Sequence, residues 1–77
     1  AVQLFARYAE LVGADRVAVP ADRAGTIDEM VQYLRSLPGG ADLPERPLVA
    51  VNLSQVDGGY RPVPGDEIAL LPPMAGG

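Results

Sequence analysis

Two pairs of adjacent carboxylates are the side chains in this sequence that are best suited to acid–base chemistry. Asp66 is followed by Glu67, and Asp28 is followed by Glu29. Neighbouring residues of a strand point to opposite faces, so Asp66 and Glu67 cannot share a proton or flank one bond. Asp28 and Glu29 follow Thr26 and Ile27, in the pattern of a helix start that acidic residues stabilise. We therefore interpret both pairs as structural.

Other catalytic chemistries are limited by composition, because the sequence has no cysteine and no histidine. Disulfides, structural zinc sites, thiol nucleophiles and imidazole bases are thereby excluded. Two internal glycine pairs, Gly39–Gly40 and Gly58–Gly59, lack the surrounding pattern of a phosphate-binding loop and are predicted to lie in turns. The sequence thus predicts no catalytic side chains, no metal site and no bound cofactor.

A third glycine pair, Gly76–Gly77, is the last in the sequence and follows Pro72–Pro73 closely. The prolines are expected to stiffen the exit from the preceding strand and hold the final residues away from the body. Glycine has no Cβ, so such an end can pass through a narrow channel and adopt the shape that the channel dictates. The α-carboxylate of Gly77 then becomes the distinctive reactive group of the protein.

Length and charge narrow the class of protein further. The chain has 77 residues, 48% of them hydrophobic, and a net charge of −4. This composition predicts one small folded domain, and the acidic charge argues against nucleic acid as a partner. No apolar run reaches membrane-spanning length, and no signal-peptide pattern is present. We expect a single cytoplasmic domain over residues 1–77, not bound to membranes, with a flexible tail over residues 72–77.

The first half of the chain predicts two strands and a short helix. Residues 2–6 alternate between apolar and other side chains, which indicates a strand. Good helix formers occupy residues 6–12 and stop at Gly13, a residue typical of helix ends. Residues 16–19 are of strand type and are closed by Pro20.

The strongest local signal is a helix that begins after Thr26. The Thr26 side chain can cap the helix, while Glu29, three residues on, can bond back to it. Residues 37–40 (Leu-Pro-Gly-Gly) end the helix. Within this helix, apolar residues recur at the spacing of one helix face, namely Ile27, Met30, Val31 and Leu34.

The second half of the chain predicts further strands joined by turns. Residues 48–51 form a short apolar run of strand type, and residues 67–71 form the last strand. Residues 57–59 (Asp-Gly-Gly) predict a turn of the hairpin kind, and residues 64–66 (Pro-Gly-Asp) a second turn. The stretch 36–47 is interpreted as a loop. This order of elements predicts an α+β roll, with a sheet packed on one main helix.

Several motifs match one known family in order and spacing over nearly the whole chain. They resemble the small subunit of molybdopterin synthase, a sulfur carrier. The matching segments are Phe5-Ala6-Arg7, Glu10-Leu11-Val12-Gly13, Val49-Ala50-Val51-Asn52, Pro64-Gly65-Asp66-Glu67 and Leu71-Pro72-Pro73-Met74-Ala75-Gly76-Gly77. The resemblance implies a ubiquitin-like β-grasp fold with a mixed sheet, in agreement with the order of elements above.

The resemblance also implies a function that depends on the chain end. An adenylyltransferase of the ubiquitin-activating type would use ATP to activate Gly77, and a sulfur donor would convert it to a thiocarboxylate. The tail would then give its sulfur to a cyclic pyranopterin inside the large synthase subunit, with Gly76 providing clearance. The large subunit would supply the catalytic side chains, so this chain would not be an enzyme by itself.

Three alternatives remain open from the sequence. The chain resembles other sulfur carriers of the same fold, which serve thiamine-thiazole synthesis or amino-acid sulfur transfer. Those carriers tend to lack the short helix of residues 6–13 and the double proline Pro72–Pro73, so both features favour the pterin pathway. A protein modifier conjugated to target lysines is a second alternative, and an interaction module with an inert tail is a third.

Alternation also predicts a docking surface on the sheet. Phe5 and Leu71 fall on the face that points away from the main helix, because Leu4 and Leu70 face it. One helix covers only one side of a small sheet, so Phe5 and Leu71 are expected to be partly exposed. Exposed apolar patches commonly mark interfaces. The predicted partner-binding residues are Phe5, Leu71, Pro72, Pro73, Met74 and Ala75.

Overall fold

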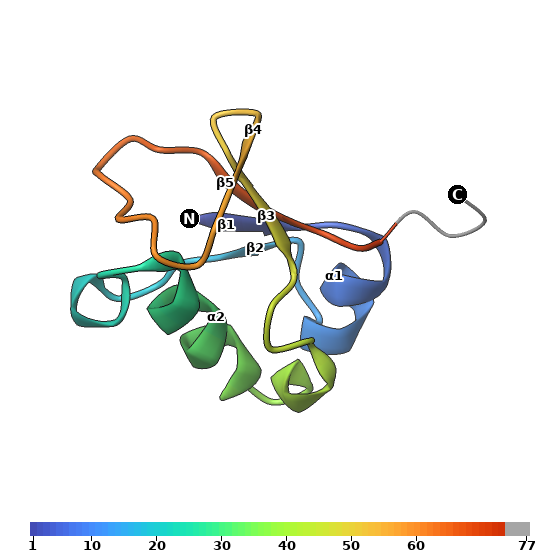
Figure 1. Ribbon diagram of the computed structural model, residues 1–77. Coiled ribbons are helices and arrows are strands. Elements are labelled where there is room, and N and C mark those ends of the chain that lie inside the picture. The colour runs from blue at the N-terminus through green and yellow to red at the C-terminus, as the bar shows by residue number, and fades with distance from the viewer. Residues whose placement is uncertain (74–77) are drawn as a thin grey trace.

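The computed structural model describes residues 1–73 and contains one five-stranded sheet (Figure 1). None of the helices in this range has the length and apolar character needed to cross a membrane. The elements are β1 Val2–Leu4, α1 Ala6–Val12, β2 Arg16–Val17, the 3₁₀ turn η1 Ala21–Arg23, α2 Ile27–Arg35, the 3₁₀ turn η2 Gly40–Asp42, β3 Leu48–Val51, β4 Ser54–Val56 and β5 Ile68–Leu71.

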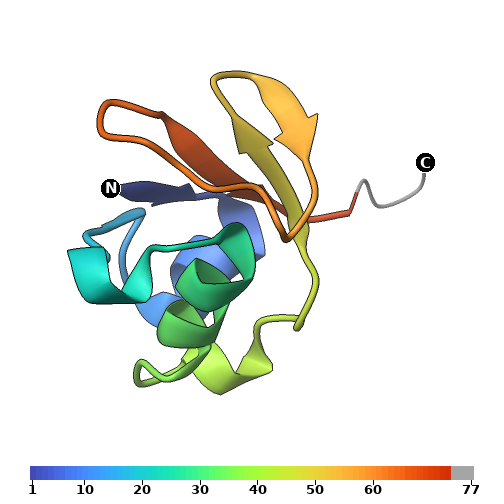
Figure 2. The same cartoon turned by 60° about the vertical axis from the view of Figure 1, so that its left-hand side comes forward.

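The sheet is mixed, with the strand order β2-β1-β5-β3-β4. The central pair, β1 and β5, is parallel, and its register aligns Leu4 with Leu70. All other pairs are antiparallel, and β3 joins β5 with Leu48 opposite Leu71. Both helices lie on the same side of the sheet (Figures 1 and 2). The predicted α+β roll, a mixed sheet on one main helix, is therefore confirmed.

A single hydrophobic core lies between α2 and the sheet. The predicted helix stripe is buried throughout, and it shares one cluster with Val2, Leu4, Ile68 and Leu70, as expected. The remaining members of the buried core come from α1, from the segment after η2 and from β3, namely Tyr8, Leu43, Val49 and Val51. Alternate residues of each strand thus face the helices and are removed from solvent.

The start of α2 is capped mainly by backbone carbonyls from a distant turn. The N–H groups of Ile27 and Asp28 each donate 3.0 Å hydrogen bonds, to the carbonyls of Tyr60 and Gly58 respectively. The predicted Thr26 cap is present, since its Oγ1 accepts a 3.2 Å bond from the N–H of Glu29. The return bond expected from the Glu29 side chain is not formed among residues 1–73. The first-turn donors of α2 are nevertheless satisfied.

The hairpin lies earlier in the chain than the sequence predicts. β3 and β4 are joined through Asn52 and Leu53, whose φ angles of 50° and 71° are those of a tight left-handed turn. Such turns usually carry glycine at the second position, so Leu53 hides the signal. The turn at 57–59 exists, but it caps α2 and does not join paired strands.

Strand ends also differ by one or two residues from the prediction. β1 ends at Leu4 because α1 begins two residues later, and β2 ends at Val17 before reaching the predicted residue 19. β5 begins at Ile68, because the N–H and carbonyl of Glu67 both bond to Asn52 outside the ladder. The short helix at 6–12 is confirmed, with Gly13 in the left-handed conformation at its end.

The segment 36–47, predicted only as a loop, packs the two helices together. It contains η2 and buries the side chain of Leu43. Gly39 has a φ of 82°, and a Cβ there would collide with the carbonyl oxygen of Leu11. The Nε of Arg35 donates a 2.9 Å hydrogen bond to the Leu43 carbonyl. Gly39, in the segment that follows α2, therefore allows close contact with α1.

Candidate functional site

The chain leaves the body of the protein from the centre of the sheet. β5 lies between β1 and β3 and ends at Leu71, where Pro72 and Pro73 follow. Pro72 is half-buried and Pro73 is exposed. The other predicted site residues, Met74, Ala75, Gly76 and Gly77, lie outside the described residues. The position of the exit is thus fixed by strands on both sides.

Three exposed apolar side chains border this exit, and we name them the tail-side apolar surface. They are Phe5, Leu48 and Leu71, which are 45%, 44% and 38% exposed. Leu48 is paired with Leu71 across β3 and β5, and the parallel register that aligns Leu4 with Leu70 brings Phe5 to the level of Leu71. The expected exposure of Phe5 and Leu71 is confirmed.

Leu48 was not predicted as a site residue, although its strand was. Val49 and Val51 of β3 are buried, so strict alternation places Leu48 on the opposite face. That pattern was present in the sequence as a short apolar run with no polar residue to mark its outer face. Only the pairing with Leu71 shows that Leu48 borders the tail exit.

The backbone on either side holds Phe5 in its outward position. Phe5 has an extended conformation, with φ −119° and ψ 151°, and it precedes the first turn of α1. Its carbonyl accepts a 3.0 Å hydrogen bond from the N–H of Tyr8. Leu4 and Tyr8 are both buried in the core. With Leu4 and Tyr8 held in the core, the Phe5 side chain between them stays partly exposed.

The next row of the same sheet face is small or polar. Gln3, Ala69, Ala50 and Gln55 lie side by side in register across four strands. The two central alanines leave this part of the face without projecting side chains. A partner that covers the tail-side apolar surface can therefore lie flat against the sheet behind it.

The opposite end of β5 is held by a hydrogen-bonded cluster around Asp66. Its carboxylate accepts bonds of 2.9 Å from the Val63 N–H, 2.9 Å from the Asn52 side-chain amide and 3.2 Å from the Tyr60 hydroxyl. The Asn52 amide oxygen accepts a 3.0 Å bond from the N–H of Glu67. The structural interpretation of Asp66 and Glu67 is confirmed. Asn52 lies 14 positions from Asp66, so its part in the cluster was not predicted.

These contacts change the proton affinities of two groups. The hydrogen bonds from Val63 and Asn52 lower the pKa of Asp66, since they favour its charged form. Loss of hydration raises the pKa of Tyr60, and the neighbouring Asp66 carboxylate raises it further. Both shifts favour the states present at neutral pH, an ionised Asp66 and a neutral Tyr60. The cluster thus stabilises the position of the residues at the start of β5.

No described part of the chain resembles a metal centre. Within residues 1–73, no group of three acidic side chains lies close enough to hold a metal ion. What the described site offers is a stiff exit from a central strand, with apolar side chains at its border. Such an arrangement can present a chain end to a partner and contact that partner at the same time.

Comparison with known proteins identifies the family of this chain. The model of the ThiS family matches residues 2–77. The crystal structure of SAMP1 from Haloferax volcanii is similar, with a TM-score of 0.78 and 28% identity, over 99% of this chain and 96% of that one. A crystal structure of H. volcanii small archaeal modifier protein 1 has a TM-score of 0.77 and 27% identity, over 95% and 94% of the two chains.

A third solved structure shows the same fold at lower identity. The solution structure of the Haloferax volcanii HVO 2177 protein has a TM-score of 0.75 and 24% identity, over 99% of this chain and 83% of that chain. These similarities confirm the ubiquitin-like β-grasp fold. Since the family model covers all but the first residue, the chain belongs to the ThiS family of ubiquitin-like sulfur carriers and modifiers.

Proposed function

We propose that this chain is a sulfur carrier for molybdopterin synthesis. An ATP-dependent adenylyltransferase of the ubiquitin-activating type joins the Gly77 carboxylate to AMP and releases pyrophosphate. The outer sulfur of a persulfide donor then displaces AMP and forms an acyl disulfide with Gly77. A second thiol attacks the donor sulfur of that disulfide, so that the terminal thiocarboxylate is released and the two thiols are left joined as a disulfide. The thiocarboxylate gives its sulfur to a cyclic pyranopterin in the active site of the large synthase subunit. The chain supplies the sulfur, and its partners supply the catalytic groups and the ATP site.

The observation that supports this proposal best is the geometry around the end of β5. The strand is paired with β1 up to Leu70 and with β3 up to Leu71, and Pro72 and Pro73 follow at once. Proline restricts φ, so the residues after Pro73 start from a defined direction. The Gly76–Gly77 pair follows the double proline after two intervening residues, and its lack of side chains suits a narrow active-site channel.

The partner contacts proposed here lie on the tail-side apolar surface and along the tail. Phe5, Leu48 and Leu71 would pack against the large subunit, while Pro72 to Ala75 would line the entrance to its channel. Apolar and aromatic anchors near the centre of an interface commonly dominate its energy. We propose the same surface for the adenylyltransferase, because that enzyme must reach the same chain end.

Two features favour the pterin as the sulfur acceptor over thiazole or amino-acid precursors. One is α1, whose presence directly after β1 is confirmed by the structure. The other is the double proline Pro72–Pro73 at the tail exit. Both were motifs of the resemblance to the molybdopterin synthase small subunit. The proposal of a specific acceptor depends on them.

Intact-mass spectrometry of the full chain tests the proposal. After incubation with the adenylyltransferase, ATP and a sulfur donor, the mass should rise by the difference between sulfur and oxygen. Deleting Gly77, or replacing Gly76 with valine, should abolish sulfur transfer to the pterin without changing the melting temperature. Gly59→Ala is a matched control, because a Cβ there meets only ordinary contact distances. A deletion variant that still supports pterin synthesis would overturn the carrier proposal.

A second candidate function is conjugation to target proteins. It is favoured by the similarity to SAMP1, since one of the similar structures is named a small archaeal modifier protein. Carrier and modifier share the adenylation step and differ in the product. A modifier forms an isopeptide bond to a target lysine, and a carrier forms a thiocarboxylate. Tandem mass spectrometry for glycine remnants on lysines, beside the intact-mass assay, separates the two.

A further inference from the structure

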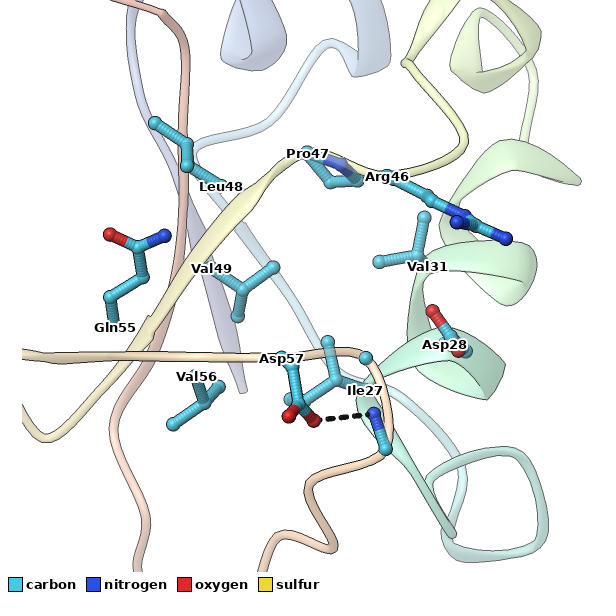
Figure 3. Close-up of a pocket in the computed structure, with 12 residues that line it drawn as sticks. Ile27, Asp28, Val31, Arg46, Pro47, Leu48, Val49, Gln55, Val56 and Asp57 are labelled. Carbon is cyan, nitrogen blue, oxygen red and sulfur yellow. Dashed lines mark hydrogen bonds between the residues drawn. The ribbon is translucent and has the colours of Figure 1, made fainter.

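A second surface feature lies away from the tail exit, at the point where β4 leaves β3. The last paired residues are Val49 and Val56, after which the chain turns away toward the start of α2. Leu48 and the residues before it therefore have no neighbouring strand on that side. The result is a groove of about 490 Å³ between β3, the turn at 57–59 and α2 (Figure 3).

The groove has an apolar floor. Val31 from α2, Val49 from β3 and Val56 from β4 line it, and Pro47 and Leu48 border it (Figure 3). Leu48 also belongs to the tail-side apolar surface, so the two surfaces meet at this residue. Val31 and Val49 are almost fully buried, so the accessible apolar surface of the groove comes from Val56, Pro47 and Leu48. An aliphatic side chain gains free energy in proportion to the apolar area that it covers there.

The edge of the groove also offers a free backbone acceptor. In a two-residue hairpin of this type, Val51 and Ser54 form a hydrogen-bonded pair, and so does every second pair along the ladder. The groups of Val49 therefore point to β4, and the carbonyl of Pro47 points to the same side. Within residues 1–73 no donor bonds to that carbonyl. An added extended segment can supply the missing N–H.

Charges of opposite sign lie at the two ends of the groove. Arg46 lies at the end where β3 begins, while Asp28 and Asp57 lie at the end formed by α2 and the 57–59 turn (Figure 3). Within the described residues, the single ion pair is Arg35 with Glu45, so none of these charges is in a salt bridge. The groove thus has a positive end, an apolar centre and a negative end.

The groove does not suit a free anion such as phosphate. The N–H groups of Ile27 and Asp28, which an anion would need at the start of α2, already donate to the carbonyls of Tyr60 and Gly58. Gly58 is closely packed, since a Cβ there would collide with the Asp28 carboxylate. The charges that remain available belong to side chains at the rim.

We infer that this groove binds an extended segment of a partner protein with one basic residue, apolar residues and one acidic residue in series. The apolar side chains lie against Val56 and Pro47, above the buried Val31 and Val49. The basic residue pairs with Asp28 and Asp57, and the acidic residue pairs with Arg46. The site does not depend on the tail chemistry, although it shares Leu48 with the tail-side apolar surface.

Nuclear magnetic resonance titration of the ¹⁵N-labelled full chain tests this inference. The probe is a blocked pentapeptide with Leu-Val-Leu between an arginine and a glutamate, used in both sequence orders. One order should shift the amide signals of Gln55, Asp57 and Val31 in a saturable way, and sodium chloride should weaken the binding. A peptide with glutamate at both ends should bind more weakly, and one with a serine centre should not bind.

Variants of the protein make the test sharper. Asp57→Asn keeps the oxygen that accepts the 2.9 Å bond from the Gly59 N–H, so it removes the charge alone. This substitution should lower the affinity for the arginine-containing peptide by about two- to fivefold, the range expected of one exposed ion pair. Asp22→Asn, which lies in η1 outside the groove, should change nothing.

Several outcomes would overturn the inference. These are the absence of groove shifts with either peptide order, equal binding of the peptide with two glutamates, and shifts confined to Phe5 and Leu71. Unchanged affinity in Asp57→Asn would also contradict it. Thiocarboxylate formation, measured separately by mass, would be unaffected in each case, so this failure is distinct from failure of the carrier proposal.

Discussion

The two faces of the sheet are made by the same strands but differ in what covers them. On one face, Leu4 and Leu70 lie beneath the helices and are almost fully buried. On the other face, their chain neighbours Phe5 and Leu71 are exposed to about the same degree as Leu48 beside them. A shift of one position along a strand thus separates residues that hold the fold together from residues that are free to bind a partner.

This difference explains how so small a domain can have both a stable core and an apolar surface that is available for a partner. The helix-facing residues form one connected cluster, so each of them contributes to the same core. The outward residues have no described element over them, and their apolar surface is available for a partner. Substitutions on the first face should change folding, and substitutions on the second should change binding. The following predictions test that separation.

The largest effect on stability is expected for a buried residue of the core between α2 and the sheet. Leu34→Ala removes a fully buried side chain and should lower the free energy of unfolding by about 2–5 kcal/mol. Gln32→Ala, on the exposed side of the same helix, should lower it by less than about 0.5 kcal/mol. Urea denaturation of both variants checks this. Equal midpoints would mean that the faces of α2 do not differ as described.

The next effect is expected for an aromatic residue on the opposite face. Phe5→Asp should weaken binding to the proposed partner, the large synthase subunit, by about 30-fold or more, as for an interface anchor. Folding should be nearly unchanged, because Phe5 is the residue before α1 and aspartate is favoured there. Leu53→Asp is a matched control, since Leu53 is 96% exposed at the far end of the sheet. Isothermal titration calorimetry with both variants should separate them.

A smaller effect is expected for Leu48, which lies at the border of two surfaces. Leu48→Ala should weaken binding to the same subunit by about fivefold, the effect of losing about 1 kcal/mol of apolar contact. Its exposed side chain contributes little to the core, so the melting temperature should stay close to that of the wild type. A large loss of stability instead would place Leu48 with the buried face.

The smallest effect is expected on the pH dependence of stability, through Asp66 at the start of β5. The pKa of Asp66 lies below its usual 3.8, so the folded state binds this proton less readily than the unfolded state. The stabilisation is present above pH 3.8 and is lost as the pH falls through the folded-state pKa. Urea midpoints should therefore fall more steeply in acid for the wild type than for Asp66→Asn. Asp22→Asn, an exposed control, should follow the wild type.

Local patterns in the sequence determined the helices and the principal core. The stripe of α2, the Thr26 cap and the glycine end of α1 are each contained within a few neighbouring residues. Helix and strand periodicities then indicate which side chains face inward, without knowledge of the partner element. The same reasoning predicted the exposure of Phe5 and Leu71, since it requires only alternation and one covered face.

Only the tertiary structure decided the features that join distant parts of the chain. The bonds from Asn52 to Asp66 and Glu67 span 14 and 15 positions, and no local pattern predicts them. The hairpin turn was hidden because Leu53 stands where a glycine is usual. The groove beside β3 exists because β4 ends at Val56 and the chain then turns to cap α2. Its position follows from packing between elements, and sequence periodicity carries no record of that packing.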